Sequence, residues 1–426
     1  MGPEIIMLVL AASAAGALIG TFTGLVPGVH VNTLAAMLLA AYPSIETAVS
    51  GIAPEGYAAV LVSCCIMSAS AVHSFVDFVP SAFIGAPDPE DALTVLPAHR
   101  LLMEGRGMDA VRAAAIGSAV GAAAALALAI PMQWLLLQGL GPVLDTVTFG
   151  VLCVTLAVIV LTSRRPLVTM LLALVAGVLG YFVMNEDIPC TGILGEGTLL
   201  FPLLTGLFGI PPLLEIQKGA RIPEQRDSGE DPVGPVPGLK GVLTGCLAGW
   251  FPGITATAGA SLASAFSGEK DPARFISMTA SIGTVTSVFS IVTLSVSGSG
   301  RSGTALAVKE IIGDSLDGFC SEAFILILFS IAIASALGYA ITIQSGKVMA
   351  GVSSSVPAEI LADAVLVLMV ILVLLLTGPW GLIVLAISAG IGMLPPALGV
   401  SRVCLASCLI IPAMMSQMDI IRFGKP

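Results

Sequence analysis

Charged side chains are scarce in this chain. Lysine, arginine, aspartate and glutamate together make up 10% of its 426 residues, whereas hydrophobic residues make up 56%. Soluble proteins carry about a quarter charged residues, so this composition argues against a soluble protein. It predicts an all-α polytopic protein of the plasma membrane, surrounded by the lipid bilayer. The net charge of −10 argues against a nucleic-acid partner, because nucleic-acid binding needs a basic face.

Sequence motifs of several enzyme classes are also missing. The chain has no Gly-x-x-x-x-Gly-Lys-[Ser/Thr] phosphate loop, no His-Glu-x-x-His zinc motif and no Gly-x-Ser-x-Gly nucleophile motif. Its three histidines are scattered, and its eight cysteines lack the spacing of metal ligands. We therefore expect no enzymatic activity, no metal site and no cofactor.

One pattern of glycines and a Pro-Gly pair occurs twice in the sequence. Residues 16–28 read GALIGTFTGLVPG and residues 241–253 read GVLTGCLAGWFPG, so that glycines and a Pro-Gly pair recur at an offset of 225. Glycines spaced by four residues leave a bare helix face that allows close packing in lipid. Two halves with matching helix breaks are typical of secondary transporters. The repetition predicts an N-terminal repeat at 1–217, a cytoplasmic linker at 218–240 and a C-terminal repeat at 241–426.

The apolar runs predict about 12–14 membrane segments. An odd number of segments in each half would insert the two repeats upside down relative to each other. Placing the linker in the cytoplasm puts most of the 17 lysines and arginines on that side, as the positive-inside rule requires. Arg422 and Lys425 do not fit this topology, so the side of the C-terminal tail stays open.

The two Pro-Gly pairs are the first candidate site. Proline and glycine should break a helix in each half, and a new helix beginning after each break would present unpaired N–H groups to an anion. Polar side chains follow both breaks. The predicted substrate-binding residues here are Gly28, His30, Asn32, Thr33, Gly253, Thr255 and Thr257.

A second candidate is the Ser-Gly segment SVSGSGRSG at 295–303. Such a sequence is unsuited to a lipid-facing helix, and the guanidinium of Arg301 suits a carboxylate. We predict that Ser297, Ser299 and Arg301 bind substrate. An extracellular loop with a solvated arginine is an equally valid interpretation.

His73 and Asp77 form a third candidate. Their spacing of four residues places both on one helix face inside an apolar run. Ionisable groups within a membrane segment are typical of ion pathways, so we predict that this pair couples transport to Na⁺ or H⁺. The alternative is a structural histidine that is hydrogen-bonded to its own aspartate.

Four segments resemble the TctA family, the large membrane subunit of tripartite tricarboxylate transporters, in its divergent archaeal branch. They are GTFTGLVPG at 20–28, HRLLMEGRG at 99–107, PGITATAGASLAS at 252–264 and TLSVSGSGRSG at 293–303. The resemblance implies an ion-driven carrier of di- or tricarboxylates, with a small membrane subunit and an extracytoplasmic binding protein as partners. One departure is the segment FISMTASIGTVTSVF at 275–289, which has neither carboxylate nor amide where bacterial members have both.

These observations together predict a secondary active transporter of a small organic anion of the di- or tricarboxylate class, driven by an ion gradient. The alternatives are a passive anion channel and an intramembrane enzyme, although the sequence lacks a channel filter motif and a nucleophile beside a base. The sequence leaves open the substrate, the coupling ion and whether the protein is a homo-oligomer.

Overall fold

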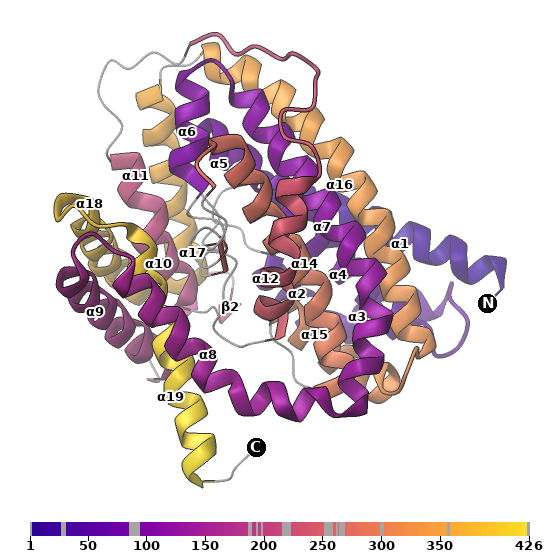
Figure 1. The fold of residues 1–426 in the computed structure, drawn as a ribbon. Coiled ribbons are helices and arrows are strands. Elements are labelled where there is room, and N and C mark those ends of the chain that lie inside the picture. The colour runs from indigo at the N-terminus through magenta and orange to yellow at the C-terminus, as the bar shows by residue number, and fades with distance from the viewer. Residues whose placement is uncertain are drawn as a thin grey trace.

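The computed structural model describes residues 2–26, 31–84, 94–185, 190–192, 195–196, 199–214, 223–250, 259–260, 263, 269–298, 302–355 and 358–423. Almost all of these residues are helical (Figure 1), and β1 (Thr191–Gly192) pairs with β2 (Gly195–Glu196). The elements before the linker are α1 (Pro3–Leu25), α2 (Val31–Ala40), α3 (Tyr42–Ser50), α4 (Ala58–Val76), α5 (Phe78–Ile84), α6 (Val95–Met103), α7 (Gly107–Leu135), η2 (Leu136–Leu140), α8 (Gly141–Leu161), α9 (Pro166–Asn185), α10 (Leu200–Leu204), η3 (Thr205–Gly209) and α11 (Ile210–Leu214). Those after it are α12 (Val236–Trp250), α14 (Pro272–Ser297), α15 (Gly303–Ile312), η4 (Gly313–Leu316), α16 (Glu322–Ser355), α17 (Ala358–Gly392), α18 (Leu394–Ala397), η5 (Arg402–Ala406) and α19 (Ser407–Phe423).

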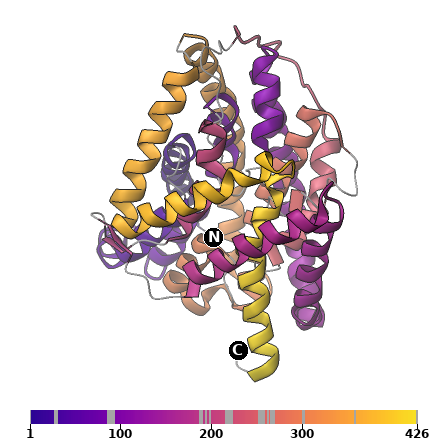
Figure 2. The ribbon, with the colours of Figure 1, turned by 90° about the vertical axis from the view of Figure 1, so that its left-hand side faces the viewer.

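Seven helical stretches in the described residues are long and apolar enough to cross a membrane. They correspond to α1, α4 with α5, α7, α9, α14, α16 and α17. The prediction of an all-α polytopic membrane protein is therefore confirmed. Other apolar runs form shorter helices, such as α2 with 10 residues, which cannot cross a bilayer alone. The last helix, α19, projects beyond its neighbours (Figure 2).

Two helices form the centre of the bundle. In the spans of α4 and α14, 83% and 78% of the most apolar window is buried, against 33% for α1 and α17. Local sequence sets the ends of α14. Pro272 occupies the first turn, the Asp271 carboxylate accepts the Arg274 N–H at 2.9 Å, and Gly298 ends the helix in the left-handed conformation.

The two glycine ladders pack in the same way. In α1, a Cβ placed on Gly16, Gly20 or Gly24 would lie too close to the carbonyl oxygens of Cys65, Ala69 and His73 in α4. In α12, a Cβ on Gly241, Gly245 or Gly249 would crowd the carbonyl oxygens of Met278, Ile282 and Thr286 in α14. Each glycine therefore lets its helix approach the backbone of a central helix. Both pairs run parallel, since residue numbers rise together along the two members.

Each central helix also packs against a long helix from the other side of the linker. The Ser68 hydroxyl on α4 donates to the Ser330 carbonyl on α16, and Phe75 lies against Gly338 farther along, so these helices run parallel. The Ser118 hydroxyl on α7 likewise donates to the Ala280 carbonyl on α14. The bundle therefore interlocks the parts of the chain before and after the linker.

The contact between α7 and α16 fixes the direction of the two central helices. Gln133 near the end of α7 binds Cys320 just before α16, while Gly346 near the end of α16 lies against Val111 at the start of α7. These helices are therefore antiparallel. Because α7 also runs parallel to α14 (Gln133 binds Ser295 near its end) and α16 runs parallel to α4, α4 and α14 point in opposite directions.

The described residues of the predicted linker that precede α12, residues 223–235, run along the top of the bundle in Figure 1. The Gln225 side chain accepts the Gly107 N–H at 2.8 Å and donates to the Leu102 carbonyl at 3.1 Å. Asp227 accepts two hydrogen bonds from Arg112 on α7, and its other oxygen lies 4.0 Å from Lys347 on α16. The linker is thus bound both to α7, which precedes it in the chain, and to α16, which follows it. We call residues 223–229 the strap.

Candidate functional site

The end of α1, which precedes the first Pro-Gly pair in the sequence, lies beside His73 and Asp77. A Cβ on Gly24 would touch the side chain of Val76, the amide nitrogen of Asp77 and the carbonyl of His73. The helix ends at Leu25, and α2 begins at Val31. The close packing of α1 on α4 therefore brings the end of α1, just before the predicted helix break, into contact with the backbone of His73 and Asp77.

His73 and Asp77 are both buried, with 4% and 6% of their surfaces exposed. His73 Nδ1 lies 3.0 Å from the hydroxyl of Thr23 on α1. The same hydroxyl also donates to the Gly20 carbonyl at 3.2 Å. The structure therefore connects His73 to the helix that leads to the first Pro-Gly pair. Sequence reasoning missed Thr23, although it lies inside the repeated segment.

The register of the ladders identifies positions in α14 that correspond to this pair. Gly24 lies against the His73 carbonyl, and its counterpart Gly249 lies against the Thr286 carbonyl. Each residue of α4 therefore corresponds to the residue of α14 whose number is higher by 213. At that offset, Thr286 and Ser290 occupy the places of His73 and Asp77. The Thr286 hydroxyl donates within its own helix to Ile282 at 2.8 Å, and Ser290 donates to Ser287 at 2.7 Å. Ionisable side chains thus occupy these positions in α4 only.

The Ser-Gly segment, which is the second candidate site, lies at a different depth in the bundle from His73 and Asp77. Ser297 is the last residue of α14, and its hydroxyl donates to the Thr293 carbonyl at 2.9 Å. The Ser302 hydroxyl accepts the Ala305 N–H at 3.1 Å and caps α15. Because α14 runs away from the strap, Ser297 lies at the opposite end of the bundle, whereas His73 and Asp77 lie closer to the middle. Ser297 is therefore not part of the group around His73.

Most of the predicted substrate-binding residues lie outside the described residues. This applies to Gly28, His30, Gly253, Thr255, Thr257, Ser299 and Arg301. Asn32 and Thr33 belong to the first turn of α2, but their side chains are outside the described part. The roles assigned to these residues remain predictions.

Trp250 is a residue that the sequence analysis did not select. It ends α12, two residues before Pro252, and only 3% of its surface is exposed. Its indole N–H has no hydrogen-bond partner in the structure as described. Several other buried side-chain atoms of the described residues also lack a partner, and Trp250 is the one nearest in sequence to the second Pro-Gly pair. The corresponding residue in α1 is Leu25, so the sequence offered no paired polar signal.

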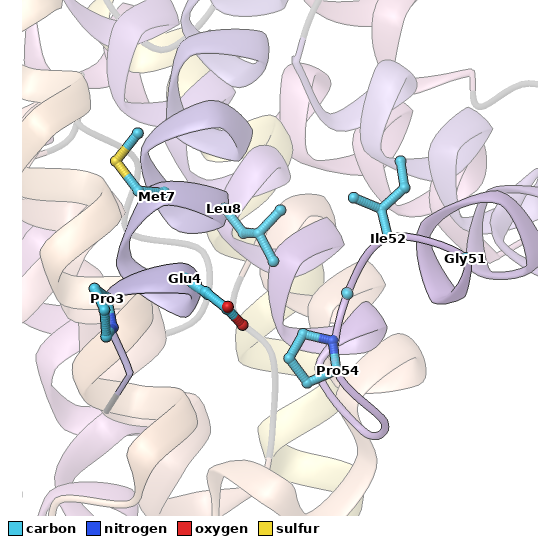
Figure 3. A pocket seen from close by; sticks show the side chains of 8 residues that line it. Pro3, Glu4, Met7, Leu8, Gly51, Ile52 and Pro54 are labelled. Carbon is cyan, nitrogen blue, oxygen red and sulfur yellow. The ribbon is translucent and has the colours of Figure 1, made fainter.

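A shallow pocket at the surface is unrelated to these residues. It lies between the start of α1 and the turn after α3, lined by Pro3, Glu4, Met7, Leu8, Gly51, Ile52, Ala53 and Pro54. Figure 3 shows the Glu4 side chain between α1 and Pro54. Within the described ranges, no group of three or more His, Cys, Asp or Glu side chains is arranged to hold a metal ion.

Comparison with known proteins agrees with these features. The model of the "Tripartite tricarboxylate transporter TctA family" matches residues 10–406. The chain is also 28% identical over 302 residues to the "Uncharacterized protein MJ1079" of Methanocaldococcus jannaschii, covering 69% of this chain and 70% of that protein. No solved structure shows significant similarity. Because the family model spans nearly the whole chain, the protein belongs to the TctA family of tripartite tricarboxylate transporters.

Proposed function

We propose that this protein is an ion-driven secondary active transporter that carries a small organic anion of the di- or tricarboxylate class across the plasma membrane. Membership of the TctA family and seven helices able to cross a membrane support a transport role. The observation that carries the proposed mechanism is the paired packing of the glycine ladders on two antiparallel central helices.

This packing supports two inverted structural repeats. The pairs α1–α4 and α12–α14 have the same spacing of close contacts, and the central helices point in opposite directions. In transporters with inverted repeats, the substrate site lies between the repeats at broken helices. We place the substrate at the two Pro-Gly pairs, with Gly28, His30, Asn32 and Thr33 on one side and Gly253, Thr255 and Thr257 on the other. Ser297, Ser299 and Arg301 would bind a carboxylate at the end of α14.

The coupling ion would be handled by α4. His73 and Asp77 are buried beside the end of α1, while α14 has Thr286 and Ser290 at the corresponding positions. An asymmetric pair of ionisable groups in otherwise similar repeats supports one coupling site for Na⁺ or H⁺ rather than two. Movement of α1 relative to α4 would alter the contact between His73 and Thr23. Ion binding at His73 and Asp77 could thereby be coupled to the helix movement of the transport cycle.

The family supports partners as well as a substrate. We propose a small membrane subunit and an extracytoplasmic binding protein, in keeping with the tripartite family. The strap carries Arg226 and lies beside Arg100, Arg106 and Arg112, which supports a cytoplasmic location for the linker. The end of α14 and the turn before α16 would then face the outside.

The first test is the thermal stability of the purified protein against mono-, di- and tricarboxylates, with and without Na⁺ and across pH. A ligand that binds the folded state raises the melting temperature by mass action. We expect one carboxylate to raise it, more strongly with Na⁺ or at acid pH, and Arg301→Ala to remove the effect, with Arg164→Ala at an exposed position as a charge-matched control. If only cations, amines or lipids stabilise the protein, the proposed substrate class is wrong.

A further inference from the structure

A buried glutamine on α7 binds both ends of the connection between α14 and α16. Gln133 is completely buried. Its amide nitrogen donates to the Ser295 hydroxyl at 3.0 Å and to the Gly318 carbonyl at 3.3 Å, and its oxygen accepts the Cys320 N–H at 3.0 Å. Both hydrogens of the amide group and its oxygen are thereby used.

The residues that Gln133 binds flank the segment with the predicted carboxylate-binding groups. Ser295 precedes that segment, and Gly318 and Cys320 follow it. Residues 296–317 between them include Ser297, Ser299 and Arg301, as well as α15. One side chain from before the linker thus fixes the separation between the two ends of a segment that comes after it.

The turn before α16 needs such an anchor. Cys320 has a φ of 53°, the one left-handed value found at a non-glycine residue in the described structure, and Gly318 has a φ of 90°. Left-handed backbone is unfavourable for a residue with a Cβ and persists only where the surroundings hold it. The Gln133 oxygen bonds directly to the N–H of the strained residue.

A glutamine side chain also holds the turn before α7 by both accepting and donating hydrogen bonds. There Gln225 of the strap accepts the Gly107 N–H and donates to the Leu102 carbonyl. The turns that precede the two long antiparallel helices are therefore both fixed by a glutamine from elsewhere in the chain. Only the turn bound by Gln133 belongs to a segment with predicted substrate-binding residues.

We propose that Gln133 is a positioning residue for transport: by holding Ser295, Gly318 and Cys320 together, it fixes the two ends of the segment in whose sequence the predicted carboxylate-binding residues Ser297, Ser299 and Arg301 lie. This proposal rests on the proposed function. Gln133 itself does not bind the substrate. Its effect comes through the two ends of the segment that it joins.

The test uses the full-length protein in proteoliposomes with citrate as the transported probe. Gln133→Leu removes all three hydrogen bonds, and Gln133→Glu keeps the acceptor while losing the amide donors. We expect Gln133→Leu to raise the KM for citrate about tenfold or more, because misplacing binding groups by about 1 Å is costly. Gln133→Glu should recover toward wild type as pH falls, because a protonated carboxyl regains one donor. Gln138→Glu, an exposed position five residues on, is the matched control and should behave as wild type.

A second measurement reports on the turn without transport. In a variant that retains only Cys320 of the eight cysteines, the rate of maleimide labelling measures how firmly the turn is held. Gln133→Leu should accelerate labelling, whereas Gln138→Glu should not. Faster labelling with an unchanged KM would overturn the positioning role, and unchanged labelling would overturn the anchoring itself. If the wild-type protein neither binds nor transports carboxylates, the proposed function fails, while the labelling comparison still decides whether Gln133 holds the turn.

Discussion

The hydrogen bond between His73 and Thr23 joins α1 to α4 where α1 ends. The Thr23 hydroxyl also donates to the Gly20 carbonyl at 3.2 Å. Valine at this position keeps the shape of threonine but has no hydroxyl, so it cannot form a hydrogen bond with the ring. The hydrogen bond that joins His73 to α1 would then be lost.

We therefore expect Thr23→Val to destabilise the protein by about 0.5–1.5 kcal/mol, the usual net contribution of one hydrogen bond. Thr23→Ser retains the hydroxyl and should preserve both stability and the response of transport to pH. Thermal unfolding and a pH series of citrate uptake measure the two effects. Equal behaviour of the valine and serine variants would show that the hydrogen bond is unimportant.

Trp250 leads to the opposite expectation for stability. Its N–H is buried without a partner, so Trp250→Phe removes an unfavourable polar group and keeps an aromatic ring. We expect the melting temperature to stay the same or to rise, because the unpaired donor costs about 1–3 kcal/mol. Trp134→Phe, at a residue with 52% of its surface exposed, is the control. A clear loss of stability in Trp250→Phe alone would mean that the indole N–H has a favourable partner in the protein.

At the scale of helices, the glycine ladders set how closely α1 and α12 approach the central helices. A Cβ on Gly20 would collide with the Ala69 carbonyl, and one on Gly245 would crowd Val285. Gly150 in α8 has no atom within 4 Å of such a Cβ. The three positions therefore separate the effect of packing from that of helix propensity.

We expect Gly20→Ala and Gly245→Ala to destabilise the protein by about 1–3 kcal/mol each through overpacking. Gly150→Ala should instead stabilise it by about 0.5–1 kcal/mol, because alanine favours the helix more than glycine does. Thermal unfolding of the three variants in the same detergent is the measurement. Equal changes at all three positions would contradict the importance of the ladders.

The strap is an element whose contacts depend on charge. Burial alone would raise the pKa of Asp227, but hydrogen bonds from Arg112 and the Gly229 N–H, together with the positive charges of Arg112 and Lys347, leave this pKa below its ordinary value of 3.8. The contribution of Asp227 to stability is therefore present above that value and is lost as pH falls through the lowered pKa.

We expect Asp227→Asn to weaken the strap by about 0.2–1 kcal/mol at neutral pH, the range for accessible ion pairs. Cleavage of the strap by a protease added to open membranes should become faster in this variant. Asp231→Asn, which removes a linker carboxylate that binds only nearby backbone N–H groups, is the control. An unchanged cleavage rate in Asp227→Asn would show that backbone and Gln225 contacts hold the strap without the ion pairs.

Sequence patterns predicted some of these elements but not how they meet. The composition predicted a helical membrane protein, and the spacing of Gly16, Gly20 and Gly24 predicted a helix face for close packing. The partner register could not be predicted, because the offset between the two parts of the chain changes from 225 in the ladders to 213 in the central helices. The correspondence of His73 with Thr286 therefore required three-dimensional contacts. Gln133 carries no local signal either, since its three partners lie more than 160 residues away.

At the scale of the whole molecule, the strap and the turn before α16 lie at opposite ends of the bundle. Lys347 near the end of α16 approaches Asp227, whereas Gln133 binds Cys320 just before the start of α16. The helix between them is long and apolar enough to cross a membrane. The two regions should therefore be reached from opposite sides.

We expect sided labelling to show this in a cysteine-free background. A membrane-impermeant maleimide added to intact cells should label Asp317→Cys, and it should label Glu230→Cys only after the membrane is opened. Both residues are exposed, so accessibility within the protein does not explain the difference. Labelling of both positions in intact cells would contradict the proposed orientation.

The interlocking of the central helices has a consequence for how the protein is made. The helix α4 packs on α16, so it lacks one of its main neighbours until the ribosome has completed α16, whereas α14 packs on α7, which is made before it. The polar residues of α4, including Ser68 and His73, must therefore remain in the bilayer or the insertion machinery, without their contacts to α16, during most of the synthesis of the chain.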